Sequence, residues 1–159
     1  MVDASRRGFF RGRPRPKAEI RPPWAIPEGP FVAACTRCNE CLKICPEQII
    51  VVGDGGYPRV DFKRGECTFC GDCVKACQPQ ALLRAEEQPA WLHIAVIGPS
   101  CLAQRGVECR VCEDFCAARA IRFSPRLGGS PLPVIDPEKC TGCGACVAPC
   151  PVDAISLVG

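Results

Sequence analysis

The sequence has no long apolar stretch. Nowhere in its 159 residues do about 18 apolar residues follow one another, as a membrane-spanning helix requires. The N-terminus also lacks the apolar region of a cleaved secretory signal. We therefore expect no membrane span, and we expect a protein of the cytoplasm, where a reducing environment keeps thiols free.

Aromatic residues are scarce as well. The chain has seven Phe, two Trp, one Tyr and one Met, which is little material for an apolar core. Small domains with such thin cores commonly depend on bound metal for their folding free energy. The only histidine, His93, lies in the alternating segment Trp91–Ile97 and is expected to pack or to face solvent. A single histidine cannot form a Rieske pair, which needs two.

The sequence shows no catalytic constellation. Neither paired carboxylates nor a nucleophile with its base can be argued from residue spacing, so we expect that the chain is not an enzyme. The glycine-rich stretch Gly53–Gly56 is not a phosphate loop, because no helix start with Lys-Ser/Thr follows it. Nucleic acid is not expected as a partner, because the arginine-rich start lacks regularly spaced aromatic residues and the rest of the chain is slightly acidic.

Cysteine, in contrast, is abundant, and its spacing carries the chemistry. The run Cys140–Pro151 reads C-x2-C-x2-C-x3-C-P, the pattern that wraps a 4Fe–4S cluster in bacterial ferredoxins. Disulfides are disfavoured, because four cysteines within about a dozen residues would compete for partners. A structural zinc site would instead show two separated ligand pairs. The 16 cysteines form four groups: Cys35, Cys38, Cys41, Cys45; Cys67, Cys70, Cys73, Cys77; Cys101, Cys109, Cys112, Cys116; and Cys140, Cys143, Cys146, Cys150.

Ligation is expected to cross between neighbouring groups. In two-cluster ferredoxins the fourth cysteine of each run binds the other cluster. This rule predicts four 4Fe–4S clusters, each held by one quartet of cysteines. The quartets are Cys35, Cys38, Cys41 and Cys77; Cys67, Cys70, Cys73 and Cys45; Cys101, Cys109, Cys112 and Cys150; and Cys140, Cys143, Cys146 and Cys116.

The third group departs from the pattern. Seven residues, Leu102–Glu108, separate its first two cysteines, and Ala117 stands where the regular run has proline. A complete cubane, a labile or three-iron cluster, and no cluster at all are therefore all open at this group. The loop between its first two cysteines is expected to bulge outward and to return at Cys109.

The remaining pattern predicts a repeated α+β fold. A unit of strand, cysteine loop, short helical turn and strand recurs every 30 to 40 residues, as internal repeats do. The hairpin predicted at 49–62 is followed by strands at 91–97, 120–123, 133–136 and 154–157. We predict two tandem bacterial two-cluster ferredoxin-like units with short strands and short helices, at residues 31–86 and 87–159, preceded by a basic arm at residues 1–30.

The arm is expected to be extended, with a short helical turn near residues 4–10. Its prolines disfavour a helix beyond the first dozen residues. Residues 1–22 contain seven basic residues against two acidic ones, although the net charge of the whole chain is only +3. Ser5–Arg11 is similar to a twin-arginine export motif without its apolar half. Partner binding is therefore assigned to three arginines of this arm: Arg6, Arg7 and Arg11.

The opening Val2–Gly8, the four cysteine groups and the segment Gly106–Glu113 resemble the NapF family of ferredoxin-type proteins. That family belongs to the bacterial periplasmic nitrate reductase system, and the cysteines match its ligand positions one for one. The resemblance implies a cytoplasmic iron–sulfur protein that binds the catalytic molybdenum subunit before export. It would assist maturation by assembling or reducing the 4Fe–4S centre of that subunit. The alternative is an electron-transfer ferredoxin or the electron-transfer subunit of an oxidoreductase.

Overall fold

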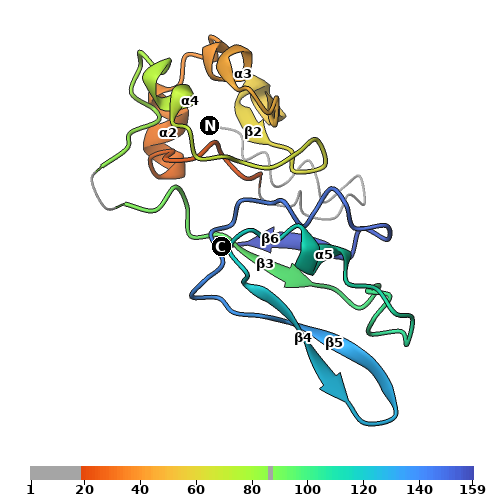
Figure 1. Cartoon of the computed structure of the whole chain (residues 1–159). Coiled ribbons are helices and arrows are strands. Elements are labelled where there is room, and N and C mark those ends of the chain that lie inside the picture. The colour runs from red at the N-terminus through yellow and green to blue at the C-terminus, as the bar shows by residue number, and fades with distance from the viewer. Residues whose placement is uncertain (1–18, 86–87) are drawn as a thin grey trace.

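The computed structural model describes residues 19–85 and 88–159 (Figure 1). Short elements alternate with long loops, as the cysteine-rich sequence predicts. The helices are α2 (Glu28–Ala34), α3 (Glu40–Ile44), η1 (a 3-10 turn, Asp54–Gly56), α4 (Asp72–Lys75) and α5 (Val111–Asp114). The strands are β1 (Ile50–Val52), β2 (Pro58–Val60), β3 (Ile94–Ile97), β4 (Ile121–Arg126), β5 (Gly129–Ile135) and β6 (Ile155–Val158).

The strands form three antiparallel pairs. The two predicted hairpins are confirmed: Ile50 pairs with Val60 in β1–β2, and Ile121 pairs with Ile135 in β4–β5. The third pair, β3–β6, joins the start of the second unit to its end. The first unit has an equivalent closure, because Ala25 forms an isolated bridge with Leu82. Each unit therefore consists of a hairpin and a closing pair, which fits the repeat seen in the sequence.

The predicted extended arm does not reach residue 30. Trp24 is only 5% exposed, and the carbonyl oxygen of Ile20 accepts a 2.7 Å hydrogen bond from the N–H of Val60. Helix α2 already begins at Glu28, directly after Pro27, and Phe31 is completely buried. Proline is disfavoured in the interior of a helix, but it is tolerated in the first turn of a helix and in an extended segment that packs. Residues 19–30 thus belong to the first unit.

The N-terminal predictions largely concern residues that the structure does not describe. The helical turn expected near residues 4–10 lies outside the described residues, and so do Arg6, Arg7 and Arg11. The basic residue of the arm that is described, Arg21, packs into the first unit. Its guanidinium lies 5.1 Å from the centre of the Phe31 ring and forms a 2.6 Å ion pair with Glu28.

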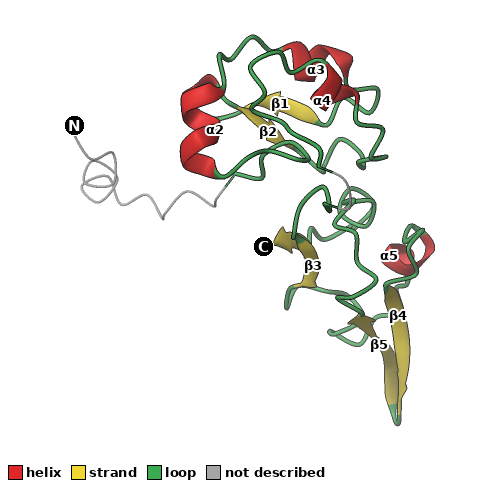
Figure 2. Cartoon of the chain, turned by 90° about the vertical axis from the view of Figure 1, so that its left-hand side faces the viewer, coloured by secondary structure: helices red, strands yellow, loops and turns green. Residues whose placement is uncertain are grey.

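The two units share a continuous buried core. In Figure 1 the first unit, with α2, α3 and α4, lies above the second unit, and Figure 2 shows the β4–β5 hairpin pointing away from the rest of the chain. Phe62 of the first unit packs edge-on against Trp91 of the second, with ring centres 5.7 Å apart. No helix among residues 19–85 and 88–159 is long and apolar enough to cross a membrane.

Candidate iron–sulfur centres

The structure brings the cysteines together as crossed ligation requires. Three small cavities are each lined by three cysteines of one group and the fourth cysteine of its neighbour. The first quartet is completed by Cys77, the second by Cys45 and the fourth by Cys116. The sequence prediction of which cysteines meet therefore agrees with the geometry of these three quartets. Their full sets are Cys35, Cys38, Cys41 and Cys77; Cys67, Cys70, Cys73 and Cys45; and Cys140, Cys143, Cys146 and Cys116.

The irregular third quartet gathers in the same way. The buried Cys112 has its pKa raised to about 11, first by burial and then by the thiols of Cys101 and Cys109, with a smaller effect from Cys150. All four predicted members are therefore close neighbours. The inserted loop between the first two cysteines turns at residues 102–106, and residues 104–108 are exposed, which agrees with the expected outward bulge, although Ala103 is buried. Its Gly106 carbonyl oxygen accepts a 3.1 Å hydrogen bond from the Ser130 hydroxyl, which ties the loop to the β4–β5 hairpin.

Left-handed backbone lets the regular groups curl around a cavity. In each regular group the residues two and four places after the first cysteine have positive φ, as Gly142 (69°) and Gly144 (82°) do. This conformation is free of steric cost for glycine but costs other residues roughly 1–2 kcal/mol. In the third group, Arg110 directly follows the second cysteine, as Gly144 does in the fourth group, but its φ is −127°. The equivalent residues in the other regular groups are Arg37 and Asn39, and Phe69 and Gly71.

A second left-handed position recurs in all four groups and was missed by sequence reasoning. It lies three residues after the last cysteine of each group. The turn directs the next backbone N–H at the sulfur of that cysteine: Ala120 N–H donates to Cys116 Sγ over 3.2 Å, and Ala154 N–H to Cys150 Sγ over 3.3 Å. The residue type gave no signal, because none of the four is glycine. They are Gln48, Gln80, Arg119 and Asp153.

Burial controls the chemistry of the thiols. It raises the pKa of Cys41, Cys73 and Cys146 to about 12, and neighbouring cysteines add to the effect. At neutral pH these thiols are therefore protonated unless a metal replaces the proton. The positive charge of iron stabilises the thiolate form, which burial disfavours. Loading the quartets thus requires iron to displace protons from the sulfurs that line the cavities.

The donor set fits a 4Fe–4S cluster. Each quartet offers four sulfurs, the ligands that such clusters use. Backbone N–H groups also point at sulfurs, as hydrogen bonds that tune a cluster do: Phe69 donates to Cys67 Sγ and Ala95 to Cys140 Sγ, both over 3.4 Å. Within the described part of the chain, no three His, Cys, Asp or Glu side chains converge as a single metal ion would require. The quartets surround a volume rather than a point.

Exposure differs among the quartets. Cys38 in the first quartet and Cys70 in the second are exposed, whereas no cysteine of the third or fourth quartet is. The first quartet has no fully buried cysteine, although the second has two, Cys67 and Cys73. Solvent access shifts the reduction potential of a cluster and brings it near a partner. The first unit therefore presents the more accessible sulfurs.

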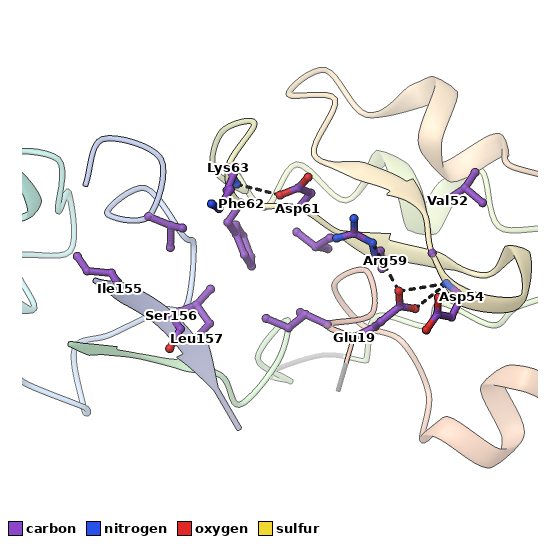
Figure 3. A pocket seen from close by; sticks show the side chains of 14 residues that line it. Glu19, Val52, Asp54, Arg59, Asp61, Phe62, Lys63, Ile155, Ser156 and Leu157 are labelled. Carbon is purple, nitrogen blue, oxygen red and sulfur yellow. Dashed lines mark hydrogen bonds and ion pairs between the residues drawn. The ribbon is translucent and has the colours of Figure 1, made fainter. Parts of the chain in front are cut away.

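A cleft of about 610 Å³ lies apart from the quartets, between the two units. Figure 3 shows Glu19 on one side, held by Arg59 at 3.5 Å and by the backbone N–H of Asp54 at 3.1 Å, and Ile155 and Leu157 on the other. None of the residues that line it is a cysteine. The cleft is thus a feature of the boundary between the units and not part of the cluster sites.

His93 packs beside Trp91, with ring centres 6.2 Å apart. Burial lowers its pKa, so it is neutral at physiological pH. Of the two expected alternatives, packing and facing solvent, the position of His93 favours packing.

Comparison with known proteins supports the same assignment. Residues 34–82 and residues 106–154 each match a family described as a 4Fe–4S dicluster domain. These spans fall inside the two predicted units, so the tandem arrangement and the 4Fe–4S cofactor are confirmed. The second match begins after Cys101, the cysteine that the inserted loop separates from its group.

Whole-chain relatives identify the family more closely. Ferredoxin-type protein NapF of Escherichia coli K12 is 47% identical over 156 residues, which are 98% of this chain and 94% of that protein. NapF of Haemophilus influenzae is 51% identical over 138 residues, 87% of this chain and 78% of that protein. The methylamine utilization ferredoxin-type protein MauM of Methylobacillus flagellatus is 35% identical over 160 residues, which cover 89% of this chain and 68% of that protein. The chain therefore belongs to the NapF family of ferredoxin-type proteins.

Proposed function

We propose that the four quartets ligate four 4Fe–4S clusters, and that the loaded protein serves the catalytic subunit of periplasmic nitrate reductase. It binds that subunit in the cytoplasm before export and assists its maturation, by assembling or reducing the subunit's own 4Fe–4S centre. The observation that supports this most directly is near-complete coverage by NapF, with crossed cysteine quartets throughout. We propose no catalytic activity for the chain itself.

The residues of this chain have three tasks in that role. When bound, 4Fe–4S clusters supply one-electron redox chemistry. The cysteines hold them, the backbone N–H groups of Ala120 and Ala154 hydrogen-bond to ligand sulfurs, and the apolar residues around them limit access of water. The exposed Cys38 and Cys70 mark the side at which the first unit meets a partner most closely. These tasks suit a protein that exchanges electrons or a cluster with another protein, and not one that converts a small substrate.

The second candidate is a plain electron carrier. It is favoured by the relatives called methylamine utilization ferredoxin-type proteins, whose name points to a different system built on a similar chain. Both candidates need the same clusters, so the quartets do not separate them. The difference lies in the partner: a maturation factor recognises an unfinished subunit, and a carrier recognises a finished enzyme.

Anaerobic purification with the nitrate reductase catalytic subunit tests the proposal. We expect a complex with the subunit that lacks its cluster, and release once iron counting and spin spectroscopy show that the cluster is in place. The matched sample is the mature subunit, which should not be retained. Rapid reduction of the mature subunit, without binding to the immature one, would establish the carrier instead.

The N-terminal arginines are proposed as the contact with that subunit. The segment is basic, and a charged contact of this kind weakens as salt rises. The test is removal of residues 2–18, because Ile20 and Trp24 pack into the first unit and a longer deletion would damage the fold. Replacing Arg6, Arg7 and Arg11 by Gln should weaken binding in the same way. Unchanged binding by both variants at low salt would assign the segment no part in recognition.

A further inference from the structure

The loops of the second and fourth cysteine groups touch across the boundary between the units. The backbone N–H of Cys67 donates to the carbonyl oxygen of Cys143 over 2.8 Å. Cys67 is buried and Cys143 is half-buried, so the contact is an interior one. Two quartets from different units are therefore direct neighbours.

An aromatic contact holds these loops together. Trp91, from the second unit, packs edge-on against Phe62 and Phe69 of the first, with ring centres 5.7 and 6.1 Å away. Its indole N–H also donates a 3.1 Å hydrogen bond to the carbonyl oxygen of Gly142, within the fourth cysteine loop. One side chain thus binds the fourth loop and the first unit at once. Aromatic pairs of this geometry contribute beyond their buried area.

The fourth cysteine loop can approach Phe62 and Trp91 closely because it has glycine at positions 142 and 144. A Cβ atom at Gly144 would overlap the ring of Phe62, and one at Gly142 would overlap the carbonyl oxygen of His93 and the indole of Trp91. Both glycines also have the positive φ that disfavours any other residue. Two independent constraints, space and backbone conformation, therefore require glycine at both positions.

The contact sets the order of the quartets in space. Inside the first unit, Cys45 of the first group lines the cavity of the second quartet and Cys77 of the second group lines that of the first, so these two quartets are neighbours. Inside the second unit, Cys116 of the third group lines the cavity of the fourth quartet, so the third and fourth quartets are neighbours too. The contact of Cys67 with Cys143 joins these two pairs. The quartets, numbered by the group that supplies three cysteines, therefore follow one another as first, second, fourth and third. The spatial order differs from the order along the chain.

We propose that this contact couples the cluster sites of the two units, with Trp91 and Phe62 as the positioning residues that hold it closed. We call it the central junction, and it comprises Phe62, Cys67, Trp91, Gly142, Cys143 and Gly144. The proposal rests on the proposed ligation by the quartets. With clusters held by the second and fourth quartets, one electron would pass between them at a time, so that one cluster would be oxidised by one electron and the other reduced by one. No bond forms or breaks, and no proton has to move.

The test uses the full-length, cluster-loaded chain, fully reduced by excess dithionite, a one-electron donor. Low-temperature electron paramagnetic resonance detects magnetic interaction between neighbouring reduced clusters. Cys38→Ser and Cys109→Ser each remove a ligand from an outer quartet, leaving the second and fourth quartets with all their ligands. In this background we expect an interaction signal, and we expect Trp91→Ala to abolish it at unchanged iron content. Trp91→Phe, which keeps a ring, should restore part of it.

The matched control is Lys63→Ala. Lys63 crosses the same boundary in a 2.9 Å ion pair with Asp153, but both side chains are exposed. This variant should keep the full signal, because exposed pairs contribute little to packing. A role of Trp91 in stability alone would lower the unfolding midpoint and leave the magnetic interaction of the folded protein unchanged.

Iron content separates failure of the junction from failure of the ligand assignment. Full iron in the second and fourth quartets without magnetic interaction would refute the junction and leave the assignment intact. Missing iron in those quartets would refute the assignment and the junction with it. If Trp91→Ala loses iron, Phe62→Leu decides, since it keeps apolar volume and removes only the ring contact. An unchanged signal in Phe62→Leu at full iron would then overturn the proposal.

Discussion

Iron counting in paired cysteine substitutions distinguishes crossed from local ligation. Cys150 is the informative residue, because it belongs to the fourth group in the sequence but lies near Cys112 of the third group in the structure. The cavity lined by Cys143 is completed by Cys116 and not by Cys150. Removing one ligand should cost one cluster of four, or roughly a quarter of the bound iron. We therefore expect Cys150→Ser to empty the third quartet before the fourth.

The size of the effect in double variants follows from which residues share a cluster. Cys109→Ser with Cys150→Ser strikes one quartet twice, so the pair should lose no more iron than either change alone, roughly a quarter. Cys143→Ser with Cys150→Ser strikes two quartets, and the losses should add to roughly half. Local ligation reverses the two results. Conversion to a three-iron cluster would shrink each loss but would leave the contrast between the pairs.

The first unit supplies a matched control. Cys38 with Cys77 should behave as one quartet, and Cys70 with Cys77 as two, because Cys77 completes the cavity of the first group. Iron is measured by colorimetry on anaerobically purified protein, with alanine variants in parallel to exclude ligation by the serine oxygen. Additive loss for Cys109 and Cys150, together with non-additive loss for Cys143 and Cys150, would refute the crossed assignment.

Three further predictions address the fold and its charges. Trp24→Ala should lower the free energy of unfolding by about 3–5 kcal/mol, because the Trp24 side chain is buried and its indole N–H donates to the carbonyl oxygen of Gln88 over 3.3 Å; a denaturant titration, with Trp24→Phe as the milder control, measures this. Removal of iron by a chelator should collapse the far-ultraviolet circular dichroism, because the core of the described residues is thin, with Trp24, Phe31 and Phe62 as its buried aromatic residues; a native-like spectrum after chelation would argue against this. The Arg21 hydrogen bond lowers the pKa of Glu28, so its contribution to stability is present above the ordinary carboxyl pKa and is lost as pH falls through the lowered one. Since Glu28 is largely exposed, the loss should stay below about 1 kcal/mol and be missing in an acid titration of Glu28→Gln.

Much of the candidate site could be predicted because spacing is itself chemical information. Four thiols within about a dozen residues would compete for disulfide partners, and a cubane needs four inward sulfurs. The crossing rule of two-cluster ferredoxins then predicted which cysteines meet. The two hairpins were also predictable, since Gly53–Gly56 and Gly128–Gly129 each interrupt a pair of apolar segments. Local rules of this kind depend on few residues and act over short distances.

Other features depend on contacts that no local pattern contains. The prolines before α2 indicated an extended chain correctly, but not that it packs, because Ile20 bonds to Val60, a residue 40 positions further along the chain. The left-handed turns at Gln48 and Gln80 are held by the surrounding fold and not by residue type. The contact of Cys67 with Cys143 joins two units, and nothing in the spacing of either cysteine group indicates that these two loops meet. Such features follow from packing as a whole.

The crossing of the quartets also changes the connectivity of the second unit. The β4–β5 hairpin ends in Leu127, which is fully exposed and offers an obvious place for a protease to cut. A break there would separate Cys116 from Cys140, yet the third quartet still needs Cys150, and the fourth still needs Cys116. Two bridges of iron and sulfur would thus span the cut. With both clusters bound, the chain segments before and after the hairpin would be cross-linked through metal. Cutting the hairpin would therefore not separate the two fragments of the second unit.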